Sequence, residues 1–202
     1  SDKKSISVNA RTEEGREIVT RIATQMDVLV ANMRPGATER IGIGAEAMAE
    51  LNPGMIEAHV TSFGWTGPYA HRPGLDPLCQ ALLGLQHAQG GPENPPVFLN
   101  SIAPNDYFAG AMAATGAIMA LYVRERGGSA QHVKTSLLNA GVVISSMEFL
   151  RYQGKPTRRY SDKGWHGLSA LHRLYESAEG WIYLSAESEK FWPGLCKALD
   201  RQ

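Results

Sequence analysis

The sequence has no excess of either charge: its 202 residues include 20 basic and 20 acidic side chains. Proteins that bind nucleic acid without sequence preference carry a basic excess, which neutralises the phosphates. The same balance provides no polybasic surface for a membrane. We therefore expect no nucleic-acid partner and no membrane partner.

Cysteine is scarce, and Cys79 and Cys196 stand far apart. Metal sites need clustered thiolate, imidazole or carboxylate ligands at short spacings, and no such pattern is present. Separated thiols are typical of a reducing compartment. The opening residues are followed by alternation, and not by the apolar core of a secretory leader. These features predict free thiols, no metal and a cytoplasmic protein.

Several catalytic motifs are missing as well. There is no Walker loop, no dinucleotide-binding glycine loop and no nucleophile elbow, and Gly42 and Gly44 alone prove nothing. The longest run without charge, 107–123, is slightly short for a membrane span and rich in glycine and alanine. It predicts a core helix. The histidines are scattered, which favours structural roles for them.

What the first third does contain is an alternation of strand and helix patterns. Strands are expected at 5–8, 27–33 and 55–63, and helices at 12–26, 37–41 and 45–51. Such alternation predicts an α/β fold with a Rossmann-like parallel sheet, flanking helices and right-handed crossovers. Ligands of such sheets bind at the carboxyl ends of the strands.

The rest of the chain predicts a completed large domain and the start of a smaller one. We expect helices at 76–85, from 105 to about 125, at 139–152 and at 188–199, strands at 97–99 and 131–138, and a hairpin over 174–184. The predicted large domain covers 1–153 and a linker covers 154–170. Residues 171–202 begin a small α+β domain.

Asp106 has two interpretations. It follows Pro104 and opens the long apolar run, whose small residues include Gly110. A carboxylate in the first turn of a helix is stabilised by the backbone N–H groups and the helix dipole, so Asp106 fits a helix cap. A carboxylate among small neighbours, which let a substrate approach, also fits a nucleophile.

Three arginines follow predicted strands at the edge where ligands bind: Arg11, Arg34 and Arg40. The planar guanidinium group suits phosphate. Asn32, at the end of the second predicted strand, offers a hydrogen bond to a base or ribose. Solvated loop charges would show the same pattern, so both interpretations stay open at this point.

Several separated motifs resemble the family III CoA-transferases, in the order found there. They are Val30-Ala-Asn-Met-Arg-Pro-Gly36, Leu51-Asn-Pro53, Gly64-Trp-Thr-Gly-Pro-Tyr69, Arg72-Pro-Gly-Leu-Asp76, Asp106 with Gly110, Arg124-Glu-Arg-Gly-Gly128, Gln131-His-Val133 and Ser136-Leu-Leu138. Leu174-Tyr175 and Glu179-Gly-Trp-Ile182 resemble the entry to the family's small domain. The resemblance covers nearly the whole chain.

The resemblance implies that CoA moves from an acyl-CoA to a carboxylic acid, with Asp106 as the nucleophile. An aspartyl mixed anhydride and an enzyme–CoA thioester are the implied intermediates. The implied contacts to CoA are Val8, Asn9, Ala10, Arg11, Asn32, Met33, Arg34 and Arg40. CoA and acyl-CoA are substrates in this scheme, and no tightly bound cofactor is expected. The start of the long helix is a natural source of N–H groups for the oxyanion.

The sequence departs from the family at three places. Leu75 stands where the racemase branch has a histidine, which favours transferase over racemase, and His71 is a weak substitute. Pro73 replaces a lysine that contacts CoA in formyl-CoA transferase. Residues 164–167 are the nearest counterpart of a glycine-rich flap. A racemase or other α-proton enzyme, and a non-catalytic CoA-binding module, therefore remain alternatives.

Family chains are roughly twice as long as this one and form interlocked homodimers. The resemblance therefore implies that the sequence is part of a longer chain. We expect a homodimer of the complete protein, and we do not expect full activity from the fragment.

Overall fold

The computed structural model describes residues 2–201 and divides into two compact units. The first unit runs to Leu83 and resumes with Asn100–Phe149. The second combines Gly84–Leu99 with the segment from Leu150 onward. The predicted large domain had included 84–99. The boundaries at 153 and 170 concern the complete protein and remain a prediction.

A three-stranded parallel sheet forms the centre of the first unit. Its strands are β1 (Val28–Ala31), β2 (Ile56–Thr61) and β3 (His132–Ser136), in the order β1-β2-β3. Val28 pairs with Ile56, and Glu57 pairs with His132. The parallel α/β fold expected from the sequence is confirmed. The carboxyl ends of all three strands meet at one edge, as the parallel pairing requires.

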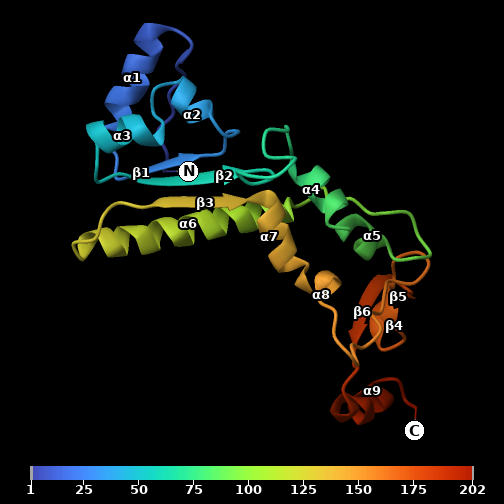
Figure 1. Ribbon diagram of the computed structural model, residues 1–202. Helices are drawn as coiled ribbons and strands as arrows, with labels where there is room; N and C mark the ends of the chain where they lie inside the picture. The colour runs from blue at the N-terminus through green and yellow to red at the C-terminus, as the bar shows by residue number, and fades with distance from the viewer. Residues whose placement is uncertain (1, 202) are drawn as a thin grey trace. The chain divides into compact units, whose positions relative to one another are not determined.

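Helices cover the two faces of this sheet (Figure 1). One layer holds α1 (Glu13–Ala23), α2 (Ala37–Arg40) and α3 (Ala45–Leu51), with a core of Ala23, Ile43, Met48 and Met55. Thr12 caps α1 by accepting a hydrogen bond from the Gly15 N–H at 3.1 Å. The α6 helix (Pro104–Glu125) lies along the opposite face. Ile56 and Ala58 pack there against Ala117 and Ala120.

The α6 helix is buried on one side only. Ala109 and Ala113 also face inward, whereas Tyr107, Ile118 and Met119 are exposed. By length and composition alone the helix would pass for a membrane span, with a mean hydropathy of 1.2. One such helix is weak support for a membrane protein, because core helices of soluble proteins pass the same test. Its alanine face packs on the sheet, as the sequence predicted for a core helix.

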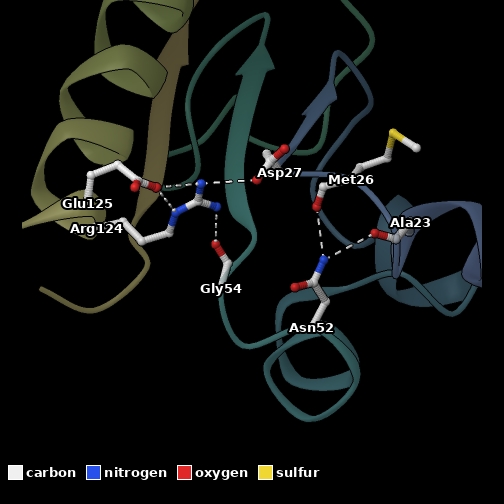
Figure 2. A network of polar contacts seen from close by, with 7 residues as sticks. All are labelled: Ala23, Met26, Asp27, Asn52, Gly54, Arg124 and Glu125. Atoms are coloured by element: carbon white, nitrogen blue, oxygen red, sulfur yellow. Dashed lines mark hydrogen bonds and ion pairs between the residues drawn. The ribbon is translucent and has the colours of Figure 1, made fainter. Parts of the chain in front are cut away.

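The carboxyl end of α6 is tied to the loops that precede β1 and β2 (Figure 2). Arg124 donates hydrogen bonds to the Gly54 carbonyl at 2.8 Å and to the Asp27 carboxylate at 3.0 Å. Nearby, the Asn52 side chain donates to the Met26 carbonyl at 2.9 Å. These contacts hold the end of α6 at the amino edge of the sheet. The start of α6, with Asp106, therefore lies toward the carboxyl edge, where ligands bind in such folds.

The remaining helices of the first unit are α4 (Asp76–Leu82), α7 (Leu137–Ile144) and α8 (Ser146–Phe149). Ser136 caps α7 by accepting a hydrogen bond from the Asn139 N–H at 3.1 Å, and the helix begins at Leu137, before the predicted start at residue 139. The single helix predicted at 139–152 is instead two short ones. At the junction the Ser145 hydroxyl donates to the Gly141 carbonyl, which also accepts the Ser145 backbone N–H at 2.9 Å, and such shared contacts often bend helices.

The second unit holds an antiparallel sheet of β4 (Gly167–Ser169), β5 (His172–Ser177) and β6 (Gly180–Ser185), in that order. It also contains α5 (Leu85–Gly90), a 3₁₀ turn η1 (Glu189–Phe191) and α9 (Trp192–Ala198). The predicted hairpin is confirmed, and Ser177 pairs with Gly180 across its turn. The predicted final helix is a 3₁₀ turn followed by an α-helix.

Three further element predictions were wrong. Residues 5–8 and 97–99 form no strand, because among the described residues neither segment pairs with a strand of either sheet. The helix predicted at 76–85 ends at Leu82, because Gly84 takes a left-handed conformation, with a φ of 71°. A β-strand needs a neighbouring strand to hydrogen-bond with, and the local sequence pattern does not show whether such a neighbour is present.

Candidate functional site

The start of α6 is capped by Asp76, a residue of another helix. The Asp76 carboxylate is 3% exposed and accepts hydrogen bonds from the backbone N–H groups of Asn105, at 2.7 Å, and Asp106, at 3.0 Å. Gln80 donates a third hydrogen bond to it, at 2.5 Å. Ala103, at the N-cap position itself, provides no side-chain cap. A buried carboxylate at this point satisfies donors that α-helices leave unpaired.

This arrangement leaves the Asp106 side chain without a capping role. Asp106 occupies the first turn of α6, is exposed, and accepts no hydrogen bond on its carboxylate within residues 2–201. The Asp106 side chain therefore makes no capping hydrogen bond, because Asp76 performs that function, and Asp106 is an acid of the first turn, as the helix-dipole interpretation expected. A carboxylate with free lone pairs is available to react.

The pKa of Asp106 is raised above its ordinary value of 3.8. Desolvation of the carboxylate by partial burial is the larger cause, and the negative charge of Asp76 is the second. Both make the ionised form less stable and so more basic. Basicity and nucleophilicity rise together for an oxygen nucleophile, which suits a reactive carboxylate.

The start of α6 does not provide free N–H groups for an oxyanion, contrary to the sequence prediction. Pro104 has no N–H, and those of Asn105 and Asp106 are bonded to Asp76. The Tyr107 N–H donates to the Ala103 carbonyl at 3.0 Å. The Asp76 carboxylate leaves the Asp106 side chain free of a capping role, but it also occupies the backbone N–H groups next to that side chain.

A cavity of about 580 Å³ opens beside Asp106 at the carboxyl edge of the sheet. Its polar lining residues are Asn32, Thr61, Ser62 and Asp106, and its aliphatic ones are Val30, Val60, Leu75 and Leu137, with Gly74 and Gly110 between them. A Cβ atom added to Gly110, one turn after Asp106, would meet nothing within 4 Å. Gly110 therefore leaves space next to the carboxylate.

A second cavity, of about 390 Å³, shares Asn32, Thr61, Ser62 and Gly74 with the first. Arg34, Arg40 and Arg72 line it. Three guanidinium groups around one hollow suit a ligand with several phosphates. Two adjoining cavities, one cationic and one holding a carboxylate, fit a ligand with a phosphorylated end and a reactive end.

The predicted CoA contacts are brought together in part. Asn32, Met33, Arg34 and Arg40 all line the second cavity. Arg72 lines it as well and was missed by the sequence prediction. The sequence feature that could have identified Arg72 is its positive charge directly before Pro73 and Gly74, in the loop that follows a predicted strand.

Val8, Asn9, Ala10 and Arg11 line neither cavity among the residues described for each. They form the turn before α1, in which the Ala10 N–H donates to the Val8 carbonyl at 3.2 Å. The Arg11 N–H donates to the Asn9 side-chain oxygen at 3.2 Å. Their role in CoA binding stays a prediction.

Cys79 lies close to this site, but its thiol is unsuited to nucleophilic chemistry. The residue is fully buried in α4, and its thiol lies 3.7 Å from the Ser62 carbonyl. Burial, with the charges of Asp76 and Asp106, raises the pKa of Cys79 to about 11. The thiolate is the reactive form, so Cys79 is inert near neutral pH.

The departures from the family pattern fall in different places. Leu75 lines the first cavity and Pro73 the second, whereas His71 lines neither. Residues 164–167 belong to the second unit, where Asp162 accepts N–H bonds from His166 at 2.8 Å and Gly167 at 3.2 Å. Their assignment as a flap remains a prediction. No cluster of three or more metal-binding side chains occurs in the described part of the chain.

The chain is similar to known CoA-transferases over nearly its whole length. The chain is 32% identical over 201 residues to a succinyl-CoA–D-citramalate CoA-transferase of Chloroflexus aurantiacus, covering 98% of this chain and 49% of the relative. It is 39% identical over 200 residues to an acyl-CoA transferase of Fusarium pseudograminearum, covering 98% of this chain and 43% of the relative. The chain thus spans about half the length of the curated relatives it matches.

The fold has solved counterparts as well. A CAIB/BAIF family protein from Brucella suis superposes with a TM-score of 0.81 at 28% identity, covering 98% of this chain and 52% of that one. The family model for CoA-transferase family III matches residues 1–202. The sequence resemblance is therefore confirmed over the full length of the chain, and the chain belongs to CoA-transferase family III.

Proposed function

We propose that the protein containing this chain transfers CoA from an acyl-CoA thioester to a carboxylic acid, with Asp106 as the nucleophile. The observation that carries this proposal is the free carboxylate of Asp106 on a cavity that adjoins a second, arginine-lined cavity. Membership of CoA-transferase family III and the printed activities of its relatives support it. The phosphorylated end of CoA would bind to Arg34, Arg40 and Arg72.

The reaction begins when an Asp106 oxygen attacks the thioester carbon. The C–S bond breaks, CoA leaves as a thiolate, and a mixed anhydride forms. The thiolate then attacks the Asp106 carbonyl carbon and releases the donor carboxylate, which leaves an enzyme–CoA thioester. The raised pKa of Asp106 favours the first attack.

The second half of the reaction repeats these steps with the acceptor. The acceptor carboxylate attacks the enzyme thioester, the thiolate leaves again, and a second anhydride forms. Attack of the thiolate on the acceptor's acyl carbon gives the new acyl-CoA and restores the Asp106 carboxylate. Anhydrides hydrolyse, so water must be kept from the site during turnover. The complete protein would have to cover Asp106, which is exposed in this part of the chain.

The test replaces Asp106 with asparagine in the complete protein. Asp106→Asn should remove CoA transfer and leave acyl-CoA binding in place, because the arginine-lined cavity is untouched. Asp200→Asn makes the same chemical change at an exposed aspartate of the second unit and should keep full turnover. In the wild type, hydroxylamine should convert Asp106 to a hydroxamate in the presence of acyl-CoA, detected by peptide mass spectrometry.

Full turnover by Asp106→Asn, or a hydroxamate at another residue, would overturn the proposal. Exchange of the substrate α-hydrogen with deuterated water, without need for an acceptor, would favour a racemase. Tight acyl-CoA binding without hydroxamate formation would favour a non-catalytic binding module.

The assembly and compartment of the complete protein belong to the same proposal. A homodimer and a cytoplasmic location remain predictions from the family resemblance and the cysteine usage. Sedimentation of the complete protein would test the first, and fractionation of cells the second.

A further inference from the structure

Tyr69 contacts a residue of the second cavity, although it is not itself among the described residues that line this cavity. Its neighbours Ala70, Arg72 and Pro73 form that part of the wall. The guanidinium carbon of Arg72 lies 4.5 Å from the centroid of the Tyr69 ring. At this distance the electron-rich face of an aromatic ring attracts a cation. Tyr69 therefore reaches a ligand in the second cavity through Arg72.

The Tyr69 ring is held in turn by the loop that follows β2. Its centroid lies 5.7 Å from the centroid of the Phe63 ring. Phe63 packs closely against Gly74, because a Cβ atom at Gly74 would lie 2.6 Å from the Phe63 ring. The Ser62 hydroxyl joins the two ends of the loop by donating a hydrogen bond to the Gly74 carbonyl at 2.9 Å. The Arg72 N–H donates to the Tyr69 carbonyl at 2.9 Å, so this loop brings the ring and the guanidinium group together.

Arg72 has no carboxylate to hold its side chain. It is exposed and, like Arg34 and Arg40, forms no ion pair within the described residues. Three guanidinium charges around one cavity also repel one another. A ligand must order such side chains when it binds, at a cost in conformational entropy. A ring that holds Arg72 in advance lowers this cost.

We propose that Tyr69 is a positioning residue, whose ring holds the Arg72 guanidinium group for the phosphate groups of CoA. The inference rests on the proposed CoA transfer and deepens the assignment of the second cavity. The attraction arises from the face of the ring, so the Tyr69 hydroxyl is not needed for it. Tyr69 acts on the affinity for CoA, and the bond changes at Asp106 do not involve it.

The experiment measures the Kd of CoA for variants of the complete protein by isothermal titration calorimetry. Arg72→Gln should weaken CoA binding about tenfold, through loss of a charge-assisted hydrogen bond to phosphate. Tyr69→Leu should weaken it about two- to fivefold. Tyr69→Phe keeps the ring and should restore the wild-type Kd. In an Arg72→Gln background, Tyr69→Leu should have no further effect, because the cation that the ring holds is gone.

A second substitution tests the ring without removing its bulk from the loop. Pentafluorophenylalanine at position 69 has nearly the shape of phenylalanine, but its fluorine atoms remove the negative charge from the ring face. It should weaken CoA binding about as much as Tyr69→Leu does. Tyr122→Leu is the matched control, since the Arg126 guanidinium carbon lies 4.9 Å from the Tyr122 ring centroid and neither residue is described as lining the second cavity. It should leave the Kd of CoA unchanged.

An unchanged Kd in Tyr69→Leu or in the fluorinated variant, or a loss of equal size in the Arg72→Gln background, would overturn the inference. Each of these results leaves CoA transfer standing, because the transfer is tested by Asp106→Asn. Full turnover by Asp106→Asn would instead overturn the proposed function, whatever Tyr69 contributes to binding.

Discussion

Replacement of Asp76 tests whether one buried carboxylate both builds the start of α6 and tunes Asp106. Asp76→Ala leaves the N–H of Asn105, a fully buried residue, without an acceptor and removes one hydrogen bond from the Gln80 amide. Each buried unsatisfied donor costs about 1–3 kcal/mol. The Asp106 N–H loses its acceptor too, but it is only partly buried. We expect the free energy of unfolding to fall by about 3 kcal/mol.

Asp76→Asn separates the charge from the hydrogen bonds. Its carbonyl oxygen can still accept from the two backbone N–H groups, and Gln80 can rotate its amide to accept from the new NH₂ group. The loss of stability should therefore be about 1 kcal/mol. The negative charge disappears, however, and it is one of the two causes that raise the pKa of Asp106. That pKa should fall.

Urea unfolding of the complete protein measures the first effect, and the pH profile of CoA transfer measures the second. Activity needs ionised Asp106, so in the wild type it should fall as the pH is lowered through a pKa above 3.8. In Asp76→Asn this limb should move to lower pH, and the rate near neutral pH should drop because the carboxylate is less basic. An unchanged unfolding midpoint in Asp76→Ala, or an unshifted acid limb in Asp76→Asn, would refute this account of the cap.

Two further predictions concern α6 and the buried thiol. Gly110→Ala should raise the free energy of unfolding by about 1 kcal/mol, from helix propensity, since its Cβ meets nothing within 4 Å. Gly116→Ala should lower it, because that Cβ would lie 2.5 Å from a methyl group of Val133 and overpacking costs about 1–3 kcal/mol. Shifts of equal sign in urea unfolding would contradict this pair. Cys79 should resist iodoacetamide at neutral pH in the folded protein while Cys196, which is partly exposed, reacts. The pKa of Cys79 is raised from 9.0 to about 11 in the folded protein, so between these pH values the unfolded thiol loses its proton and the folded one keeps it. The free energy of unfolding should therefore fall as the pH rises from 9.0 to about 11.

The sequence by itself determined the alternation of elements and the identity of the family. Periodicity placed the helix after Thr12, the strands at 27–33 and 55–63 and the hairpin at 174–184, because these signals are local. The ordered motifs identified CoA-transferase family III, which the family model confirms. Periodicity failed at 5–8 and 97–99, since a strand depends on a neighbour that local patterning does not reveal.

The tertiary structure decided what Asp106 is free to do. The sequence left Asp106 open to two interpretations, a helix cap and a nucleophile. The fold instead brings Asp76 to the first turn of α6, 30 residues further along the chain. Hydrogen bonds between distant residues depend on packing, which local propensity does not encode. The cap and the use of the nearby N–H groups follow from that one contact, and the charge of Asp76 adds to burial in raising the pKa of Asp106.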